Sequence, residues 1–357
     1  MKVEVGGKTA EFASLAEVEE RDVDWLWPDR FPLGMLCLLA GKQGLGKSVL
    51  TVEMAARVST GRAWPDGSEC PKGSVVILSE EDDLARTVKR RARAAGADLS
   101  KIFSLTMLQD GQGEYGFDLK EDLGVVCKLI LELGDVKLVV LDPLNAYLGV
   151  IDSHMDSAVR RVLGPVSRLC NAAQVTVLMV THMNKNLKVG SPVDRVMGST
   201  AVTAAARAAW RVASDPSGEK NDRVLFPIKW NVMPPDVKAF NFSMVRSPGD
   251  ASAGMIEWSN EVELSADDLI GEDGGGTRTG EAMKWLRDKL KEGKPVVAAE
   301  LLAEASQAGH KEHTLRIAKK ALGIGDFKGG KELGMRSFWF KSGGWASARK
   351  AVAEGEG

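Results

Sequence analysis

A phosphate-binding loop is the clearest chemical signature in this sequence. Residues 41–48 read GKQGLGKS and match the pattern G-x-x-x-x-G-K-[ST] at every fixed position. The glycines let backbone N–H groups turn toward phosphate oxygens, Lys47 can reach the β- and γ-phosphates, and the Ser48 hydroxyl is a ligand for Mg²⁺. The residues predicted to bind ATP are Gly41, Lys42, Gln43, Gly44, Leu45, Gly46, Lys47, Ser48 and Val49.

The flanking residues give this loop its required context. An apolar run that ends at Ala40 precedes it, and Val49, Val52, Ala55 and Ala56 follow at helical spacing. The alternative is a glycine-rich turn that matches the pattern by chance, but such a turn is not expected to lie between a strand and a helix. The sequence therefore predicts a strand–loop–helix unit that binds a nucleoside triphosphate.

An aspartate at the end of another apolar run would complete the metal site. Residues 137–141 read KLVVL and lead into Asp142, as in the strand whose terminal carboxylate holds Mg²⁺. An aspartate before Pro143 can also simply form a turn, but the phosphate loop favours the metal ligand. Ser48 and Asp142 are thus the predicted magnesium ligands.

The carboxylate that activates water must come from elsewhere. Pro143 stands where many ATPases carry a glutamate. The apolar run 74–78 is followed by SEEDD at residues 79–83, and a carboxylate there could polarise the attacking water. Glu81 is the first choice and Glu80 the second. The same cluster also suits the N-terminus of a following helix, and the two roles are compatible.

A histidine stands at the end of a fourth apolar run. His182 follows residues 175–181, where it could sense the γ-phosphate or be an ordinary hydrogen-bonded polar group. In an open parallel sheet, ligands bind beyond the carboxyl ends of the strands, so these residues should converge. This reasoning gives Lys47, Glu81, Asp142 and His182 as candidate catalytic residues.

The elements that must position these residues alternate between short apolar runs and amphipathic helices. This alternation predicts an α/β fold with a mostly parallel sheet covered by helices on both faces. Two later runs are expected to form edge strands, with an antiparallel direction as one alternative. The predicted strands are 35–40, 74–78, 137–141 and 175–181 in the parallel part, followed by 223–228 and 240–244.

Composition shifts divide the chain into an arm, two domains and a tail. The stretch GEDGGGTRTG at 271–280 has no apolar residue and predicts a flexible linker. The aromatic cluster at 25–28 could pack on the main domain or cover a nucleotide base. The predicted units are an N-terminal arm at 1–30, an ATPase domain at 31–270, the linker, a small domain at 281–341 and a tail at 342–357.

Bulk properties are those of an ordinary globular protein. The 357 residues are 44% hydrophobic and 27% charged, with a net charge of −2. The four cysteines form no C-x-x-C pair, and no run is long and apolar enough for a signal peptide or membrane span, so a cytoplasmic protein without membrane contact is expected. Residues 281–357 carry 15 basic and 10 acidic side chains, a net +5 that leaves −7 for the rest.

With these strand ends in place, the chain resembles the RepA-type branch of RecA-like hexameric ATPases, which includes plasmid and phage replicative helicases related to DnaB. The resemblance covers about residues 26–244. It implies a RecA-like fold, ATP hydrolysis with Mg²⁺, and a homo-oligomeric ring, with a hexamer as the expected size. Its carriers are residues 41–48, Ser79-x-Glu81-Asp82, Leu141-Asp142-Pro143-Leu144, Thr181-His182-x-Asn184-Lys185 and Gly198-Ser199-Thr200-Ala201.

The resemblance also implies roles for individual residues. Glu81 would be the catalytic carboxylate and His182 the γ-phosphate sensor. Arg207 would be an arginine finger that reaches a neighbouring subunit's ATP, with Arg211 as the fallback. The alternative for Arg207 is a solvated helix face, which the surrounding alanines disfavour. Lys229 follows a strand and is either a second contact to the neighbouring nucleotide or a surface lysine.

Spaced cations in a predicted loop suggest contacts with single-stranded DNA. Lys185, Lys188 and Arg195 lie among small residues in the stretch 184–196, which would face the central channel of such a ring. A solvated surface loop is the equal alternative. A second basic group, Arg86, Lys89, Arg90 and Arg93, lies at helical spacing and is better explained as a solvated or inter-subunit face.

The C-terminal region resembles a winged helix. Three predicted helices, 281–292, 295–308 and 314–322, precede a predicted hairpin at 327–340. Arg316, Lys319 and Lys320 would form an exposed basic face on the third helix, with Leu315 and Ala318 facing inward. Such a domain could contact duplex DNA, although winged helices also serve protein contacts.

These features together predict an ATP-dependent DNA helicase or translocase that acts in DNA replication. A first rival is an ATP-switched DNA-binding module that mediates recombination or regulates initiation without unwinding. A second rival is an ATPase that acts on a protein or metabolite.

Overall fold

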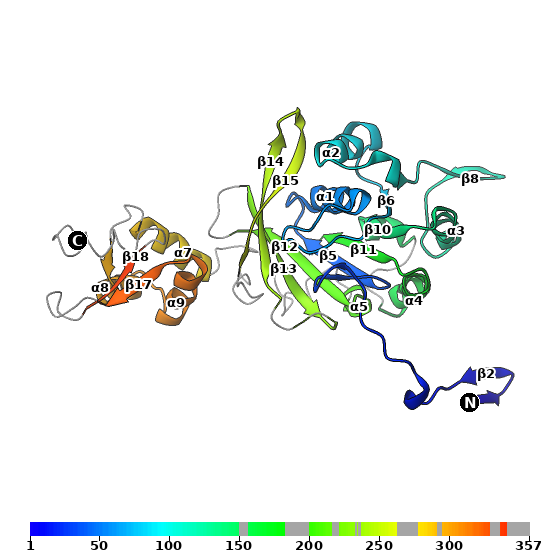
Figure 1. Cartoon of the computed structure of the whole chain (residues 1–357), viewed down its shortest axis with the longest axis horizontal. Coiled ribbons are helices and arrows are strands. Elements are labelled where there is room, and N and C mark those ends of the chain that lie inside the picture. The colour runs from blue at the N-terminus through cyan, green and yellow to red at the C-terminus, as the bar shows by residue number, and fades with distance from the viewer. Residues whose placement is uncertain are drawn as a thin grey trace.

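A computed structural model describes most of the chain. The described residues are 1–149, 156–182, 200–215, 221–232, 234, 237–262, 278–290, 295–328 and 336–340. A nine-stranded sheet dominates them, in the order β15-β14-β13-β12-β5-β11-β10-β6-β7 (Figure 1). Helices cover both faces of this sheet, which confirms the predicted α/β class.

The half of the sheet from β12 to β7 is parallel throughout. Its central strands are almost continuous runs of buried apolar residues, as expected for strands covered on both faces. The four predicted parallel strands are confirmed to within one residue at each end, whereas β12 and β7 were not anticipated. The parallel strands are β5 Leu36–Gly41, β6 Ser74–Ser79, β7 Ile102–Ser104, β10 Val136–Asp142, β11 Thr176–His182 and β12 Ala208–Ser214.

The remaining three strands run antiparallel. They are β13 Asp222–Trp230, β14 Ala239–Ser247 and β15 Asp250–Val262. The predicted antiparallel direction is confirmed, but the expectation that the two predicted runs lie at the edge is wrong. β15 adds outside β14, so β13 and β14 are interior strands.

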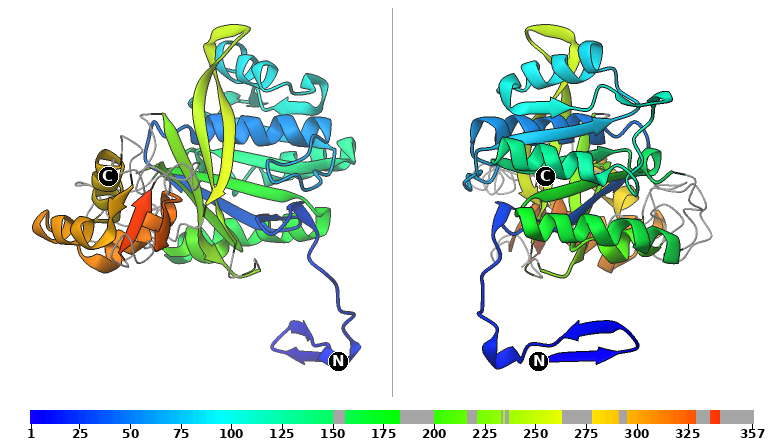
Figure 2. Two further views of the ribbon diagram at one scale, coloured as in Figure 1. Left: turned by 60° about the vertical axis from the view of Figure 1, so that its left-hand side comes forward. Right: turned by 90° about the vertical axis from the view of Figure 1, so that its right-hand side faces the viewer.

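Alternation along β5 shows how the two helical layers are built. Leu36, Leu38 and Ala40 face one hydrophobic cluster, and Cys37 and Leu39 face the other. Helices α3 Leu123–Leu133, α4 Asp156–Ala173 and α5 Thr200–Ala205 contribute to the first cluster. Helices α1 Lys47–Thr60 and α2 Lys89–Ala94 contribute to the second, on the other face of the sheet (Figure 2).

Short elements connect these layers. The short helical turns are η1 Leu15–Glu17, η2 Leu84–Val88, which is a single π-helical turn, η3 Leu99–Lys101 and η4 Leu144–Tyr147. Two small hairpins are β3 Trp25–Trp27 with β4 Phe31–Pro32, and β8 Leu108–Asp110 with β9 Gly113–Tyr115.

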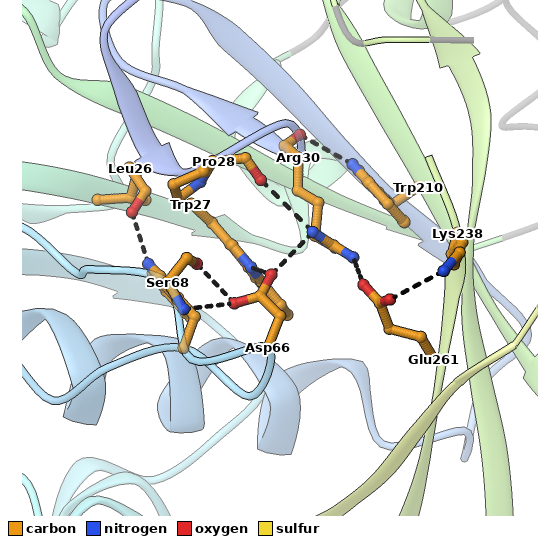
Figure 3. A network of polar contacts seen from close by, with 10 residues as sticks. Leu26, Trp27, Pro28, Arg30, Asp66, Ser68, Trp210, Lys238 and Glu261 are labelled. Carbon is orange, nitrogen blue, oxygen red and sulfur yellow. Dashed lines mark hydrogen bonds and ion pairs between the residues drawn. The ribbon is translucent and has the colours of Figure 1, made fainter. Parts of the chain in front are cut away.

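The aromatic cluster at 25–28, which was predicted as the end of the N-terminal arm, is part of the main core. Trp27 is fully buried and stacks on Trp64 with ring centroids 4.6 Å apart. Buried Arg30 donates to Asp66 at 2.9 Å and to Glu261 at 2.6 Å, which ties this segment to β15 (Figure 3). Of the two alternatives for residues 25–28, packing on the main domain is therefore confirmed.

An N-terminal hairpin projects away from the core. It consists of β1 Lys2–Val5 and β2 Lys8–Glu11, and residues 12–24 connect it to β3 (Figure 1). All residues of both strands are exposed.

The C-terminal region has a hydrophobic cluster of its own. Helices α7 Arg278–Lys289, α8 Ala298–Gln307 and α9 Glu312–Ala321 pack with an antiparallel sheet in the order β16-β18-β17. Its strands are β16 Val296–Val297, β17 Gly325–Lys328 and β18 Ser337–Phe340. Helix α7 begins inside the stretch predicted as linker, of which residues 271–277 lie outside the described residues. Among the described residues, no helix has the length and hydrophobicity needed to cross a membrane.

Candidate functional site

The phosphate loop joins β5 to α1 at the carboxyl edge of the sheet. Gly44 and Gly46 have φ values of 81° and 84°, which favour glycine. A Cβ on Gly46 would lie 2.3 Å from the sulfur of Met244, and one on Gly41 would lie 2.7 Å from the carbonyl oxygen of Val212. The backbone oxygen of Val212 leaves no room for a Cβ at Gly41, and the positive φ favours glycine at Gly46. The loop, which we call the cradle, lies at the N-terminus of a 14-residue helix.

The side chain of Lys47 lies inside this cradle. Its ammonium donates to the carbonyl oxygens of Gly41 at 3.0 Å and Lys42 at 2.9 Å, and lies 3.1 Å from Nδ1 of His182. Burial lowers the pKa of Lys47 to about 8, although the nearby carboxylates of Asp142 and Glu81 oppose this shift. The lysine is thus desolvated at the position where phosphate oxygens would bind.

Asp142 ends β10 beside the cradle. Its side chain is buried, and burial raises its pKa, while a hydrogen bond with Ser48 and the charge of Lys47 act in the opposite direction. The two oxygen donors, Ser48 and Asp142, suit a hard cation such as Mg²⁺. No cluster of three or more His, Cys, Asp or Glu side chains in the described part of the chain could hold a metal alone, so water and phosphate oxygens would complete the coordination.

His182 ends β11 and lies between Lys47 and Glu81. Its Nε2 is 3.8 Å from Oε1 of Glu81, whose side chain is 61% exposed. Burial lowers the pKa of His182, the charge of Lys47 lowers it further, and the charge of Glu81 opposes the shift, so the neutral form of the ring is favoured. In the tautomer with its proton on Nε2, Nδ1 can accept from the lysine ammonium and the N–H group faces Glu81.

The acidic stretch after β6 serves two purposes. Asp83 accepts from the backbone N–H of Arg86 at 2.6 Å and caps η2, as the capping alternative predicts. Asp82 pairs with Arg91 of α2 at 2.7 Å and contributes to raising the pKa of Asp142. Glu80 is exposed, and its backbone N–H donates to the carbonyl oxygen of Asp142 at 3.3 Å. The stretch therefore both starts a helix and supplies carboxylates to the site.

Arg207 does not join this group. It is exposed in the bend between α5 and β12, and its backbone N–H donates to the carbonyl oxygen of Leu36, at the start of β5. The phosphate loop begins at Gly41, five residues further along β5, which corresponds to about 16 Å. Arg207 thus lies at the amino edge of the sheet, opposite the phosphate loop of its own chain.

Arg211, the fallback for the arginine finger, is misplaced for that role. It lies in the middle of β12, is only 3% exposed, and its guanidinium stacks over the ring of Phe226 at 5.7 Å. The strand that carries it, β12, begins at Ala208. A side chain buried between strands cannot extend to another subunit.

Lys229 is held by its own chain. Its ammonium donates to three carbonyl oxygens at the C-terminal end of α5, those of Thr203 at 2.8 Å, Ala204 at 3.0 Å and Ala206 at 2.8 Å. Burial lowers the pKa of Lys229, and the neighbouring Arg207 lowers it further. This arrangement is not that of a free surface lysine, and the contact to a neighbouring nucleotide stays a prediction.

The residues predicted to contact DNA are undescribed, exposed or partly covered in the structure. Lys185, Lys188 and Arg195 lie outside the described residues, and the side chain of Lys320 is not described either. Arg316 is exposed and pairs with Glu312 of the same helix at 2.7 Å. Lys319 contradicts the predicted exposed face, because its side chain is 18% exposed, pairs with Asp326 and lies 4.9 Å from the ring of Trp339. Leu315 and Ala318 face inward as predicted.

The sequence did not predict the role of Met244, which lies on β14 and packs against the phosphate loop. Nearly 200 residues separate it from Gly46, and a methionine in an apolar strand carries no signal of this contact. The ion pair between Arg91 and Asp82 was not predicted either, because Asp82 was recognised only as an acidic residue after a strand.

Comparisons with known proteins agree with this geometry at the level of the family. A KaiC-like protein from the hyperthermophilic archaeon Pyrococcus horikoshii OT3 is a structural neighbour, with 15% identity, a TM-score of 0.46, and alignment over 66% of this chain and 100% of that chain. The comparison with curated proteins finds no match. A family model described as AAA domain matches residues 7–187, just over half of the chain, including the phosphate loop, Glu81, Asp142 and His182. The chain therefore belongs to the AAA domain family of P-loop ATPases.

Proposed function

We propose that this protein is an ATP-driven DNA helicase or translocase of the RecA-like ring type, in which each ATP is hydrolysed between two copies of the chain. One observation carries the proposal. Lys47, Asp142 and His182 meet at the carboxyl edge of the sheet, while Arg207 is exposed at the opposite edge. A complete site would then require residues from two chains.

The residues of the cradle fit a magnesium–triphosphate substrate. Lys47 would exchange the carbonyl oxygens of Gly41 and Lys42 for phosphate oxygens, which relieves the desolvation that depresses its pKa. Ser48 and Asp142 would hold Mg²⁺, which supplies charge neutralisation for the transferring phosphoryl group. Backbone N–H groups of the glycine-rich turn would bind the remaining phosphate oxygens.

Glu81 would orient the attacking water. As an exposed carboxylate beside His182, it can accept a proton from water while the γ-phosphoryl group is transferred. His182 contacts Lys47 through one ring nitrogen and faces Glu81 with the other. When Lys47 moves to the phosphates, His182 loses its hydrogen bond with the ammonium. The ring can then reorient, which would change its contact with Glu81 when the γ-phosphate is bound.

Arg207 would act on the neighbouring copy. A guanidinium that approaches the transferring phosphoryl group from another subunit stabilises its charge in the transition state. The exposure of Arg207 and its separation from its own phosphate loop support this role. The hexameric state expected from the sequence resemblance is part of this proposal.

DNA as the substrate is supported by sequence features. The spaced cations Lys185, Lys188 and Arg195 and the net charge of +5 in residues 281–357 suit a phosphate backbone. The C-terminal helices and hairpin have the element types of a winged helix, which we propose contacts DNA or a replication partner.

The test measures the ATPase rate with and without single-stranded DNA, together with strand displacement on a forked duplex. We expect DNA to stimulate hydrolysis and ATP to drive displacement, and Lys47→Ala to lose both. DNA-stimulated hydrolysis without displacement would instead indicate an ATP-switched DNA-binding module, which the separate C-terminal hydrophobic cluster also suits. Hydrolysis that DNA does not change would refute a DNA substrate.

A further inference from the structure

The N-terminal hairpin has one apolar and one polar face. Its register pairs Val3 with Ala10 and Val5 with Lys8, so these residues share a face that continues to Phe12. The face contains a hollow of ≈ 540 Å³ lined by Val3, Val5, Gly6, Lys8, Ala10 and Phe12. On the other face Lys2 pairs with Glu11 at 2.7 Å. The apolar face is uncovered, and Val5 is 73% exposed.

A two-stranded hairpin of this kind is marginally stable in water unless its apolar face is packed against something. The length of the connecting segment sets the distance that the hairpin can reach from the core. Residues 13–24 form a twelve-residue arm with little regular structure, which can span about 40 Å when extended. The hairpin is therefore a tethered docking element rather than a part of its own core.

The arm is strongly acidic. It carries five acidic side chains and one basic side chain, Arg21, which gives a net charge of −4. Exposed basic residues lie on the turn of η2 and on helix α2. Arg90 and Arg91 of this helix are paired with Asp250 and Asp82. Arg86, Lys89 and Arg93 are exposed and have no ion-pair partner among the described residues.

The acidic arm and these basic residues lie at opposite ends of the same molecule. In Figures 1 and 2 the hairpin extends below the sheet, whereas α2 lies at the top. Exposed apolar side chains follow α2 along the chain, at Met107, Tyr115, Val125 and Leu131 in and around β8, β9 and α3. A second copy can therefore offer both a basic helix and exposed apolar side chains to the arm and hairpin of the first.

We propose that the N-terminal hairpin and its acidic arm dock on a second copy of this chain, with the arm against Arg86, Lys89 and Arg93 and the hairpin against the apolar side chains of β8, β9 and α3. Because the two surfaces differ, the contact is head-to-tail, and repeating it gives a ring or a filament. This inference rests on the proposed function in one respect: the shared ATP site requires an assembly, and the docking contact would hold that assembly together.

Self-association of the full-length chain, measured by sedimentation velocity without nucleotide, tests the inference. A hairpin variant, Val5→Glu with Phe12→Glu, should lose assembly, because it places charge on the apolar face. An arm variant, Glu19→Lys with Glu20→Lys and Asp22→Lys, should weaken association about tenfold at low ionic strength and less at high salt. Unchanged assembly of the hairpin variant would overturn the proposal.

A charge swap supplies the matched control. The helix variant Arg86→Glu, Lys89→Glu and Arg93→Glu should also weaken association about tenfold, and mixing it with the arm variant should restore assembly, because opposite charges again meet. Failure of the mixture to assemble would refute the arm-to-helix contact. A helix variant that loses DNA binding but assembles normally would show instead that α2 is a nucleic-acid surface. Assembly through the arm without any ATPase activity would leave this inference standing and refute the proposed function.

Discussion

Replacement of Lys229 by methionine separates two roles for this residue. In the structure its ammonium closes the C-terminal end of α5 by donating to the carbonyl oxygens of Thr203, Ala204 and Ala206. Arg207 follows directly and is anchored by its backbone to Leu36. We therefore expect Lys229 to hold the turn that presents Arg207, rather than to touch a nucleotide itself.

The magnitude follows from the three hydrogen bonds. A bond from a charged donor contributes about 1.5–3 kcal/mol when it is fully desolvated. Lys229 is only partly buried, so water can replace much of each bond, and we expect the free energy of unfolding to fall by about 1–2 kcal/mol in total. A displaced Arg207 should lower kcat by about 10–100-fold, because small misplacements of catalytic groups have effects of this order.

Urea unfolding and steady-state ATPase assays measure these two effects, and a nucleotide-binding titration completes the set. Lys229→Met should bind nucleotide as the wild type does, and Lys229→Arg should restore part of both losses. Lys238→Met is the matched control, because Lys238 makes a partly exposed ion pair with Glu261 and its loss should change little. Wild-type stability combined with weakened nucleotide binding would show that Lys229 contacts the nucleotide, and would refute this reasoning.

Three further substitutions test other contacts. Gly46→Ala should lower stability by about 1–3 kcal/mol, because it adds a Cβ at φ 84° against the sulfur of Met244, and thermal unfolding of the double variant with Met244→Ala should recover the part due to overlap. Asp250→Asn should reduce stability at pH 6 but not near pH 2. The hydrogen bonds from Arg90 hold the pKa of Asp250 at about 2, below the usual 3.8, so its contribution is present above pH 3.8 and lost as the pH falls through about 2; urea unfolding at both pH values checks this. Glu81→Gln should retain nucleotide binding and lose about 100-fold or more in turnover, and equal activity in a single-turnover assay would exclude Glu81 as the water-orienting group.

The parallel half of the fold could be predicted because each strand is a continuous apolar run that ends in a polar residue. Asp142 and His182 stand at the ends of such runs. In the strand order, β11 with His182 is next to β5, and β10 with Asp142 is next to β11. The meeting of these side chains follows from parallel strands sharing one carboxyl edge. The positions of Asp142 and His182 in the sequence were therefore enough to predict that they lie close together.

The antiparallel half was less predictable. Its contacts with the site depend on pairing between distant segments, which single-sequence periodicity does not encode. Residues 208–214, which read AAWRVAS, were not recognised as a strand. Arg211 was therefore proposed as a fallback arginine finger, although its side chain is buried. Likewise, Lys319 belongs by spacing to an exposed helix face, but Trp339 and Asp326 of the adjoining hairpin cover it.

The central claim is that one active site is built from two chains. Lys47→Ala should abolish hydrolysis by removing the phosphate-binding ammonium, and Arg207→Ala should nearly abolish it by removing the group that acts on the neighbour. The decisive measurement is the ATPase rate of the two inactive variants mixed in equal amounts after dissociation and reassembly. We predict that activity returns, because some interfaces then pair an intact Lys47 with an intact Arg207 from the next chain. A mixture as inactive as its separate components would contradict the shared site.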